Sequence, residues 1–161
     1  MRIYDSYDTA AKRAETAAQV LKDTEMTDSF TGNEATAIRV NYGNILGNGD
    51  NNDALVTVSF GPENNIMAVY RKNGDSYEYA GTVGYFYGVD NISIEKLADR
   101  PDVIIFRERN NQSIGAREKS GFIRGYMYQN GKFENVLNID ENIESWFSST
   151  DNGKTSWEKV E

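Results

Sequence analysis

The sequence contains no cysteine and no histidine, and only two of its 161 residues are proline. Without cysteine, the chain has no disulfide bond, no thiol nucleophile and no cysteine-ligated metal site. Without histidine, it lacks the commonest general base and the usual zinc ligand. These absences exclude most familiar classes of enzyme, including hydrolases with a Ser-His-Asp triad.

Basic residues are also few: 17 Lys and Arg stand against 25 Asp and Glu, which gives a formal net charge of -8 at pH 7. Binding to nucleic acid requires a net basic face, so this charge argues against a nucleic-acid-binding domain. Long hydrophobic runs are absent as well, and no stretch approaches the roughly 20 residues of a membrane span. We expect a soluble, extracytoplasmic protein whose export signal has been removed, with a cytoplasmic location as the alternative.

The residues that are abundant favour β structure. The chain has 14 Gly, 10 Tyr and 7 Phe, and its apolar runs are short and separated by polar stretches. Aromatic and β-branched residues suit strands, whereas Gly, Asn and Asp suit the turns between them. The length fits a single domain over residues 1–161. We therefore predict a mainly β domain.

One segment, residues 8–24, predicts an α-helix. Alanines and Leu21 recur there at intervals of three and four residues, and Asp8 or Ser6 is available as the N-cap. Alanine buries little area, so we expect the helix to lie against the edge or face of a sheet through Val20 and Leu21 rather than to form the core. A helix of small residues also suits packing on a partner helix, which is the alternative.

Two stretches, residues 36–83 and 92–138, show the same order of elements. In each, an Asp begins an apolar strand, and an Asn-Gly pair, at 73–74 and 130–131, turns a third strand into a fourth. Asn-Gly is typical of type I′ hairpin turns, since both central positions need a positive φ. We predict two related antiparallel four-strand units behind an N-terminal helix, arranged as a partial propeller, two packed sheets or an open twisted sheet.

The C-terminal stretch, residues 140–160, follows these units. Residues 140–147 predict a short helix that turns Ile143, Trp146 and Phe147 inward, with a tight strand as the alternative. Residues 151–160 repeat the turn and the return strand, so we expect a hairpin there.

Residues 46–56 (LGNGDNNDALV) resemble the FG-GAP and VCBS repeats, in which an Asp/Asn-Gly loop precedes an apolar strand of a β-propeller blade. The resemblance implies calcium as a candidate cofactor, with Asn48, Asp50 and Asp53 as its ligands. Calcium takes six to eight oxygens, and Leu46 stands where the family has its first carboxylate. The alternative is that these residues make turns and accept hydrogen bonds from backbone donors.

Residues 149–157 resemble the Asp-box of sialidase-type propellers, with one extra residue. In that family the box is a structural hairpin remote from catalysis, so the resemblance implies no glycosidase activity.

Two clusters are candidates for binding. One is basic and surrounds the loop expected at residues 110–121, where an anionic ligand or partner would meet bidentate arginines; its members are Arg107, Arg109, Arg117, Lys119 and Arg124. Its alternative is that these cations pair with Asp and Glu on neighbouring strands. The other is Tyr85 with Tyr87, which share one face of an extended segment and suit stacking on a sugar or filling a partner's pocket, or simply cross-strand packing.

Carboxylate pairs for glycoside hydrolysis are Asp50 with Asp53 and Asp99 with Asp102. Both pairs lie where a turn enters a strand, a place where Asp is ordinary, so we assign no catalytic residue. We predict a non-catalytic binding or spacing module of a bacterial secreted or surface lipoprotein, with an unknown protein or glycan as partner. The alternatives are a small acidic inhibitor, such as an immunity protein or a nucleic-acid mimic, and a hydrolase. An inhibitor would gather its acidic residues on one face, whereas a module would scatter them.

Overall fold

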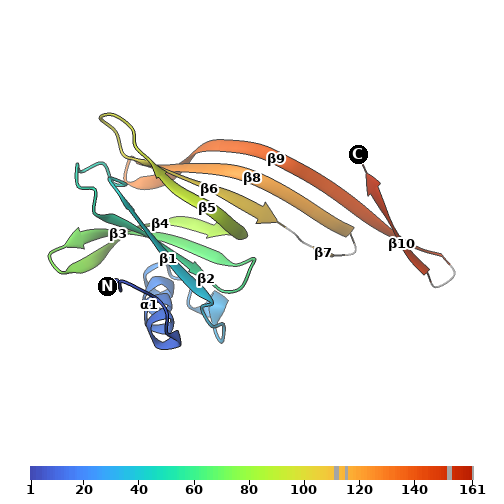
Figure 1. Ribbon diagram of the computed structural model, residues 1–161, viewed down its shortest axis with the longest axis horizontal. Coiled ribbons are helices and arrows are strands. Elements are labelled where there is room, and N and C mark those ends of the chain that lie inside the picture. Colours follow the sequence, from blue (N-terminus) through green and yellow to red (C-terminus); the bar gives the residue numbers. More distant parts are fainter. Residues whose placement is uncertain (111–112, 115, 152–153, 161) are drawn as a thin grey trace.

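The computed structural model describes the backbone of residues 1–110, 113–114, 116–151 and 154–160, and the side chains of residues 1–110 and 120–141. The described chain is mainly β, with two antiparallel sheets and one α-helix, as the sequence predicts. Figure 1 shows three layers: helix α1 lies on one face of the first sheet, and the second sheet lies on the other face. Of the alternatives left open by the sequence, two packed sheets is the one observed.

In both sheets sequential strands pair, except that β6 pairs with β8 past the two-residue strand β7. The first has the order β1-β2-β3-β4, and the second has the order β10-β9-β8-β6-β5, with β7 paired to β8. The strands of the first sheet are β1 (Ala37–Gly43), β2 (Asp53–Ser59), β3 (Asn65–Asn73) and β4 (Ser76–Phe86). Those of the second are β5 (Gly88–Glu95), β6 (Val103–Asn110), β7 (Ser113–Ile114), β8 (Ala116–Gln129), β9 (Lys132–Asp151) and β10 (Lys154–Val160).

Helix α1 (Ala10–Asp23) begins after Thr9, not after either of the caps expected from the sequence. The Thr9 hydroxyl accepts a hydrogen bond from the Lys12 backbone N–H at 3.3 Å. The carboxylate of Asp8 instead forms an ion pair with the Lys12 ammonium at 2.9 Å. A side chain one residue too early cannot reach the first free N–H groups of the helix, so the nearer hydroxyl takes that role.

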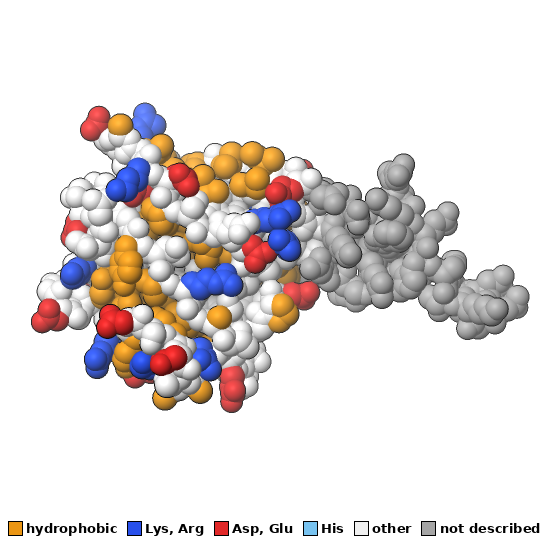
Figure 2. Space-filling model, in the orientation of Figure 1, with side chains coloured by type: hydrophobic (Ala, Val, Ile, Leu, Met, Phe, Trp, Pro, Cys, Tyr) orange, Lys and Arg blue, Asp and Glu red, His pale blue; other side chains and the backbone are white. Residues whose placement is uncertain are grey.

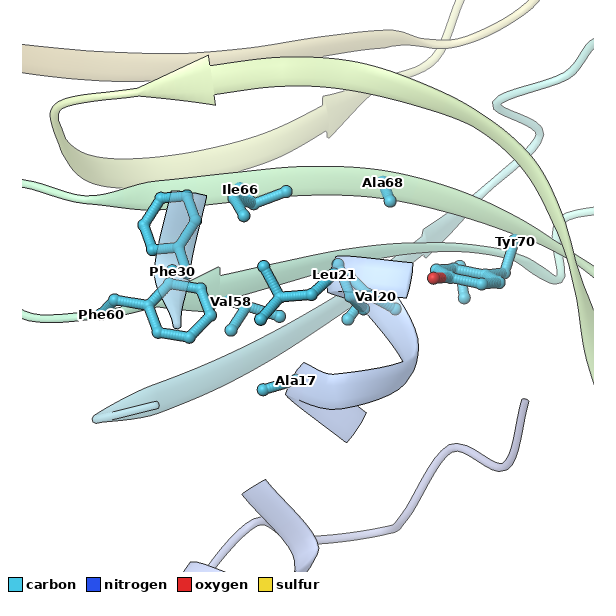
Figure 3. Close-up of a cluster of buried hydrophobic side chains, with 11 residues drawn as sticks. Ala17, Val20, Leu21, Phe30, Val58, Phe60, Ile66, Ala68 and Tyr70 are labelled. Carbon is cyan, nitrogen blue, oxygen red and sulfur yellow. The ribbon is translucent and has the colours of Figure 1, made fainter. Parts of the chain in front are cut away.

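The helix packs on the face of the first sheet, as expected, but it also forms part of the core, which corrects the prediction. Val20 is fully buried and Ala17 is 4% exposed. Strands β2 and β3 are buried on both faces. The second sheet covers one face, so helix α1 has to cover the other. Figure 3 shows the side chains of this first core, drawn from α1, the short 3-10 helix η1 (Asp28–Phe30), β2 and β3.

A second core fills the space between the sheets. Leu55 and Met67 of the first sheet are fully buried against Ile104 and Phe106 of the second. Alternate residues of β2 therefore serve different cores: Val56 faces the helix and Leu55 faces the second sheet.

The two Asn-Gly hairpins form different turns. Gln129 pairs with Lys132, and both Asn130 and Gly131 have a positive φ, as the predicted type I′ turn requires. In the other hairpin Asn73 pairs with Ser76, so Gly74 and Asp75 are the loop residues and only Gly74 has a positive φ. That pattern matches a type II′ turn, and the prediction of a type I′ turn at 73–74 is wrong.

The helix predicted at residues 140–147 is also wrong, and the strand given as the alternative is the structure observed. This segment continues β9, which pairs with β8 along its whole length up to Phe147 opposite Ala116. Beyond it, β9 and β10 form the expected hairpin, with Asp151 opposite Lys154. The inward side chains predicted for this segment, and the Asn-Gly pair at 152–153, lie outside the described residues.

The long ribbon of β8 and β9 carries β10 away from α1 (Figure 1). Among the described residues, no helix has the length and apolar character to cross a membrane.

Candidate functional site

A polar cleft of about 300 Å³ opens between the two sheets, at the end where β4 passes into β5. One wall comes from β1, β2 and the turn before β3, and the other from β5 and the end of β6. Its lining consists of Arg39, Ser59, Gly61, Pro62, Glu63, Asn65, Gly88, Val89, Asp90 and Arg109. Both cations and anions thus border one cavity.

Arg39 joins the two walls of the cleft. It extends from β1, and its Nη1 donates a hydrogen bond to the Val89 carbonyl oxygen on β5 at 3.0 Å. A guanidinium carries five N–H donors, and this contact uses one of them. Arg39 is therefore held in place by the opposite sheet while it retains the capacity to bind a further acceptor.

Arg109 approaches the cleft from β6 and pairs with Asp90 of β5 at 3.1 Å. The two side chains are 49% and 42% exposed, so water screens the pair and its net stabilisation is about 0–1 kcal/mol. A ligand carboxylate or phosphate in the cleft can take the place of Asp90 at little cost in free energy.

The buried end of the cleft is a chain of hydrogen bonds. The Ser59 hydroxyl donates to Asn65 Oδ1 at 2.6 Å, and Asn65 Nδ2 donates to the Tyr87 carbonyl oxygen at 2.6 Å. Both side chains are buried, at 7% and 3% exposed, so the amide of Asn65 has one orientation. Rigid polar groups at the base of a cavity are what orients a ligand in a pre-formed site.

Thr57 lies directly opposite Arg39 in the ladder of β1 and β2. Its hydroxyl is fully buried and has no hydrogen-bond partner among the described residues. A buried hydroxyl of this kind is normally satisfied by ordered water.

The basic cluster expected from the sequence is not a free cationic surface where the structure describes it. Arg107 pairs with Glu141, and Arg124 pairs with Glu108 at 2.9 Å and also donates to Asn138 Oδ1 at 2.6 Å. Arg109 lines the cleft, as described above. The pairing of cations with acidic residues on neighbouring strands, the alternative offered by the sequence, thus holds for these arginines.

The described residues of the loop expected at 110–121 lie in strands β6, β7 and β8, which corrects that prediction. β6 and β8 pair up to Asn110 opposite Ser120, and β7 pairs with the start of β8. Arg117 and Lys119 lie on β8, and their side chains are outside the described residues. The sequence predicts too long a loop because the polar residues of this segment are of the types found in turns. The pairing of β8 with β9, which makes the segment a strand, is a long-range interaction that these residue types do not reveal.

Tyr85 and Tyr87 pack against each other edge to face, with ring centroids 6.1 Å apart. Tyr85 also contacts Phe30, at 5.8 Å between centroids, and its hydroxyl donates to Asn64 Oδ1. Burial raises the pKa of the Tyr85 hydroxyl. The two rings therefore lie side by side, as the alternating pattern predicts, and each has partners within the protein.

The side chains of the candidate calcium loop accept hydrogen bonds from the loop itself. Asn48 Oδ1 accepts from the Asp50 N–H at 3.0 Å, and Asp50 Oδ1 accepts from the Asn52 N–H at 3.2 Å. Asp53 is 1% exposed and accepts from the Leu46 N–H at 2.8 Å. Within the part of the chain that the structure describes, no group of three or more acidic side chains is placed to hold a metal.

Because one oxygen of each of these side chains accepts a backbone hydrogen bond and the described acidic side chains form no cluster around them, we expect calcium to leave the thermal midpoint of unfolding unchanged within about 1 °C. The measurement is a melt in excess calcium and then in excess chelator. A rise of several degrees in calcium, reversed by the chelator, would establish the site that residues 46–56 predict by their resemblance.

Asp102 has the same structural role as Asp53. It is 3% exposed, and its carboxylate accepts a hydrogen bond from the Asn44 N–H at 2.8 Å, while its own N–H donates to the Asn44 carbonyl oxygen at 2.9 Å. The leading aspartates of the two predicted units thus hold the same β1–β2 connection. Neither the Asp50–Asp53 pair nor the Asp99–Asp102 pair lines the cleft.

Burial raises the pKa of the Asp53 carboxyl, opposed in part by the N–H groups of Leu46 and Ile45. The stabilisation by the protonated Asp53 carboxyl is therefore complete below the ordinary pKa of about 3.9. It is lost as the pH rises through the raised pKa of the folded protein. We expect Asp53→Asn, which is neutral at any pH, to remove this loss, so the stability of the variant relative to that of the wild type rises as the pH rises above the ordinary Asp pKa of about 3.9. Urea unfolding at each pH measures the difference. Asp75→Asn, at an exposed hairpin tip, is the control, and identical pH profiles for the wild type and Asp53→Asn would contradict the expectation.

Comparison of the chain with protein-family models, with curated proteins and with solved structures finds no match. The similarity of residues 46–56 to FG-GAP repeats therefore stays a prediction from those residues.

Proposed function

We propose that this protein is a non-catalytic binding module whose ligand occupies the cleft between the two sheets. The observation that carries the proposal is that Arg39 and Arg109, from different sheets, line one cavity with a rigid hydrogen-bonded base. Such convergence of a few polar groups on a pre-formed cavity is typical of small-ligand sites. Two arginines favour a ligand with a carboxylate or phosphate group.

The charges of the cleft support binding over hydrolysis. Glu63 and Asp90 are the acidic residues of its lining, and Asp90 is paired with Arg109. Hydrolysis of a glycoside needs two carboxylates that act together across a cleft. A paired anion and cation instead suit the exchange of a protein carboxylate for a ligand carboxylate.

The distribution of charge supports a module over an acidic inhibitor. On the face shown in Figure 2, Asp and Glu side chains are interspersed with Lys and Arg. An inhibitor that covers a basic site would present its acidic groups together. With the resemblance to FG-GAP repeats, this leads us to propose that the module belongs to a bacterial secreted or surface protein, which fractionation of the source cells tests.

A thermal-shift screen tests the binding site. We expect at least one ligand from a panel of carboxylates, phosphates and amino acids to raise the midpoint of unfolding, and Arg39→Gln to abolish that rise. Arg71→Gln is a matched control, since Arg71 lies exposed on β3 outside the cleft. Recovery of the ligand unchanged after long incubation is expected for a binding module. A rise that persists in Arg39→Gln, or conversion of the ligand, would overturn the proposal.

A further inference from the structure

A second cleft, of about 410 Å³, lies between the N-terminal segment and β1. One wall is formed by residues 4–7 and the other by alternate residues of β1. Its lining consists of Tyr4, Asp5, Ser6, Tyr7, Ile38, Val40 and Tyr42. This cleft is separate from the one between the sheets, and three of its seven lining residues are tyrosines.

The N-terminal wall is held in place by several independent contacts. The amino group of Met1 donates to the Tyr77 carbonyl oxygen, and the Tyr77 N–H donates to the Met1 carbonyl oxygen at 2.9 Å. Further along, the Tyr4 hydroxyl donates to Glu15 at 2.6 Å, and Arg13 Nη1 donates to the Tyr7 carbonyl oxygen at 2.9 Å. The wall is therefore anchored to both β4 and α1, and the cleft is pre-formed.

Tyr42 presents its ring to solvent at the opposite wall and is 50% exposed. Burial, the neighbouring Tyr77 and Tyr7, and the negative charge of Asp5 together raise its pKa to about 12. Asp5 forms no ion pair with any residue that the structure describes. Asp5, the charged residue of the cleft lining, therefore places an unpaired negative charge near the Tyr42 ring.

Tyrosine rings in this region already attract cations from the chain itself. The guanidinium carbon of Arg2 lies 5.0 Å from the centroid of the Tyr4 ring, and the Lys12 ammonium lies 5.8 Å from it. The negative face of an aromatic ring attracts a positive group at such distances. Tyr4 thus has its cations, whereas Tyr42 has none among the described residues.

We propose that the cleft bordered by Tyr7, Tyr42 and Asp5 binds a quaternary ammonium head group. The ring of Tyr42 and the carboxylate of Asp5 supply the attraction for a positive charge. Ile38 and Val40 supply an apolar surface that suits N-methyl groups and not a small hydrated cation. The negative charge of Asp5 repels an anion. Because a carboxylate accepts hydrogen bonds but does not donate them, Asp5 also disfavours the carbonyl groups of a proline-rich peptide.

The test compares choline with 3,3-dimethyl-1-butanol, which has the same shape and no charge, by titration followed with backbone-amide NMR. We expect choline to shift the resonances of residues 4–7 and 38–42 with saturation, and the uncharged analogue to bind at least about tenfold more weakly. Equal affinity for the two probes, or the absence of a saturable shift, would overturn the proposal. Tighter binding of methyl glucoside than of choline would also overturn it, since a sugar that stacks on the tyrosine rings would then be the better ligand.

Variants locate the effect. Tyr42→Ala is expected to raise the dissociation constant for choline about tenfold, while Tyr42→Phe, which keeps the ring, changes it by less than about threefold. Asp5→Asn is expected to weaken binding as well, since it removes the negative charge. Tyr79→Ala is the matched control, because Tyr79 is 42% exposed on β4 and does not line this cleft. An equal loss in Tyr79→Ala and Tyr42→Ala would overturn the assignment.

The same head group occurs on free molecules and on lipids, and a third measurement separates these sources. Co-sedimentation with phosphatidylcholine vesicles that is lost in Tyr42→Ala indicates the lipid. Binding of soluble choline without co-sedimentation indicates a free small molecule.

Discussion

Phe106→Ala is expected to lower the free energy of unfolding by about 3–5 kcal/mol. The Phe106 ring is 1% exposed between the two sheets, with its centroid 4.7 Å from that of Phe86 and 5.9 Å from that of Tyr126. Truncation removes these aromatic contacts and leaves a cavity that the flanking strands, fixed by their ladders, cannot close. Urea unfolding followed by circular dichroism measures the change.

Ile139→Ala is the control for this prediction, because Ile139 is 47% exposed on β9 and its truncation is expected to cost less than about 1 kcal/mol. The comparison also tests whether the two sheets share a core. If Phe106→Ala lost no more stability than Ile139→Ala, the packing of the second sheet against the first would contribute little, and the cleft between them would lack a rigid frame.

Gly47→Ala is expected to lower the free energy of unfolding by about 2–4 kcal/mol, for two reasons that add. Gly47 has a φ of 72°, in the left-handed region where a side chain is strained. A Cβ atom there would also lie 2.6 Å from Pro101 Cγ, and the proline ring cannot rotate away. Pro101 precedes Asp102, so displacement of the ring disturbs the contact between Asp102 and Asn44.

Gly49→Ala separates the two contributions. Gly49 lies in the same loop with a φ of 81°, and a Cβ atom there would meet nothing within 4 Å. Only the backbone strain applies, so we expect a loss of about 1 kcal/mol in the same measurement. Equal losses for the two variants would show that the loop moves away from Pro101 without cost.

The patterns that succeeded are local. Strands β2 and β3 follow from short apolar runs bounded by turn residues, and the turn at Asn130 and Gly131 follows from two residues that tolerate a positive φ. The pairing of Tyr85 with Tyr87 also needs only the alternation of an extended chain. In each case the interacting residues are close in sequence, so their types are sufficient information.

The errors arose in the register and extent of strand pairing, which the residue types of a segment do not fix. Gly74 and Asp75 became the loop because the ladder of β3 and β4 pairs Asn73 with Ser76, and that ladder contains register shifts further along. Residues 140–147 became strand because β8 offered a long edge of backbone donors and acceptors, which outweighs a short run of helical periodicity.

The cleft between the sheets gave no signal in the sequence. Arg39 is an ordinary polar position of an alternating strand, and Asn65 is one of several asparagines after a turn. They form a site with Asp90 only because the sheets pack face to face at this end. Arg109 is the residue of this cleft that the sequence did single out, as a member of the basic cluster, whereas its partner Asp90 was not predicted.

Composition and short-range spacing alone determined that this chain is built of strands joined by polar turns behind a single helix, because those preferences belong to each residue and its near neighbours. How the second sheet stacks on the first, and which polar residues thereby share a cavity, was decided by tertiary structure. Burial of β2 and β3 on both faces demands cover from partners far along the chain, and no local pattern specifies where those partners place Arg39 and Arg109.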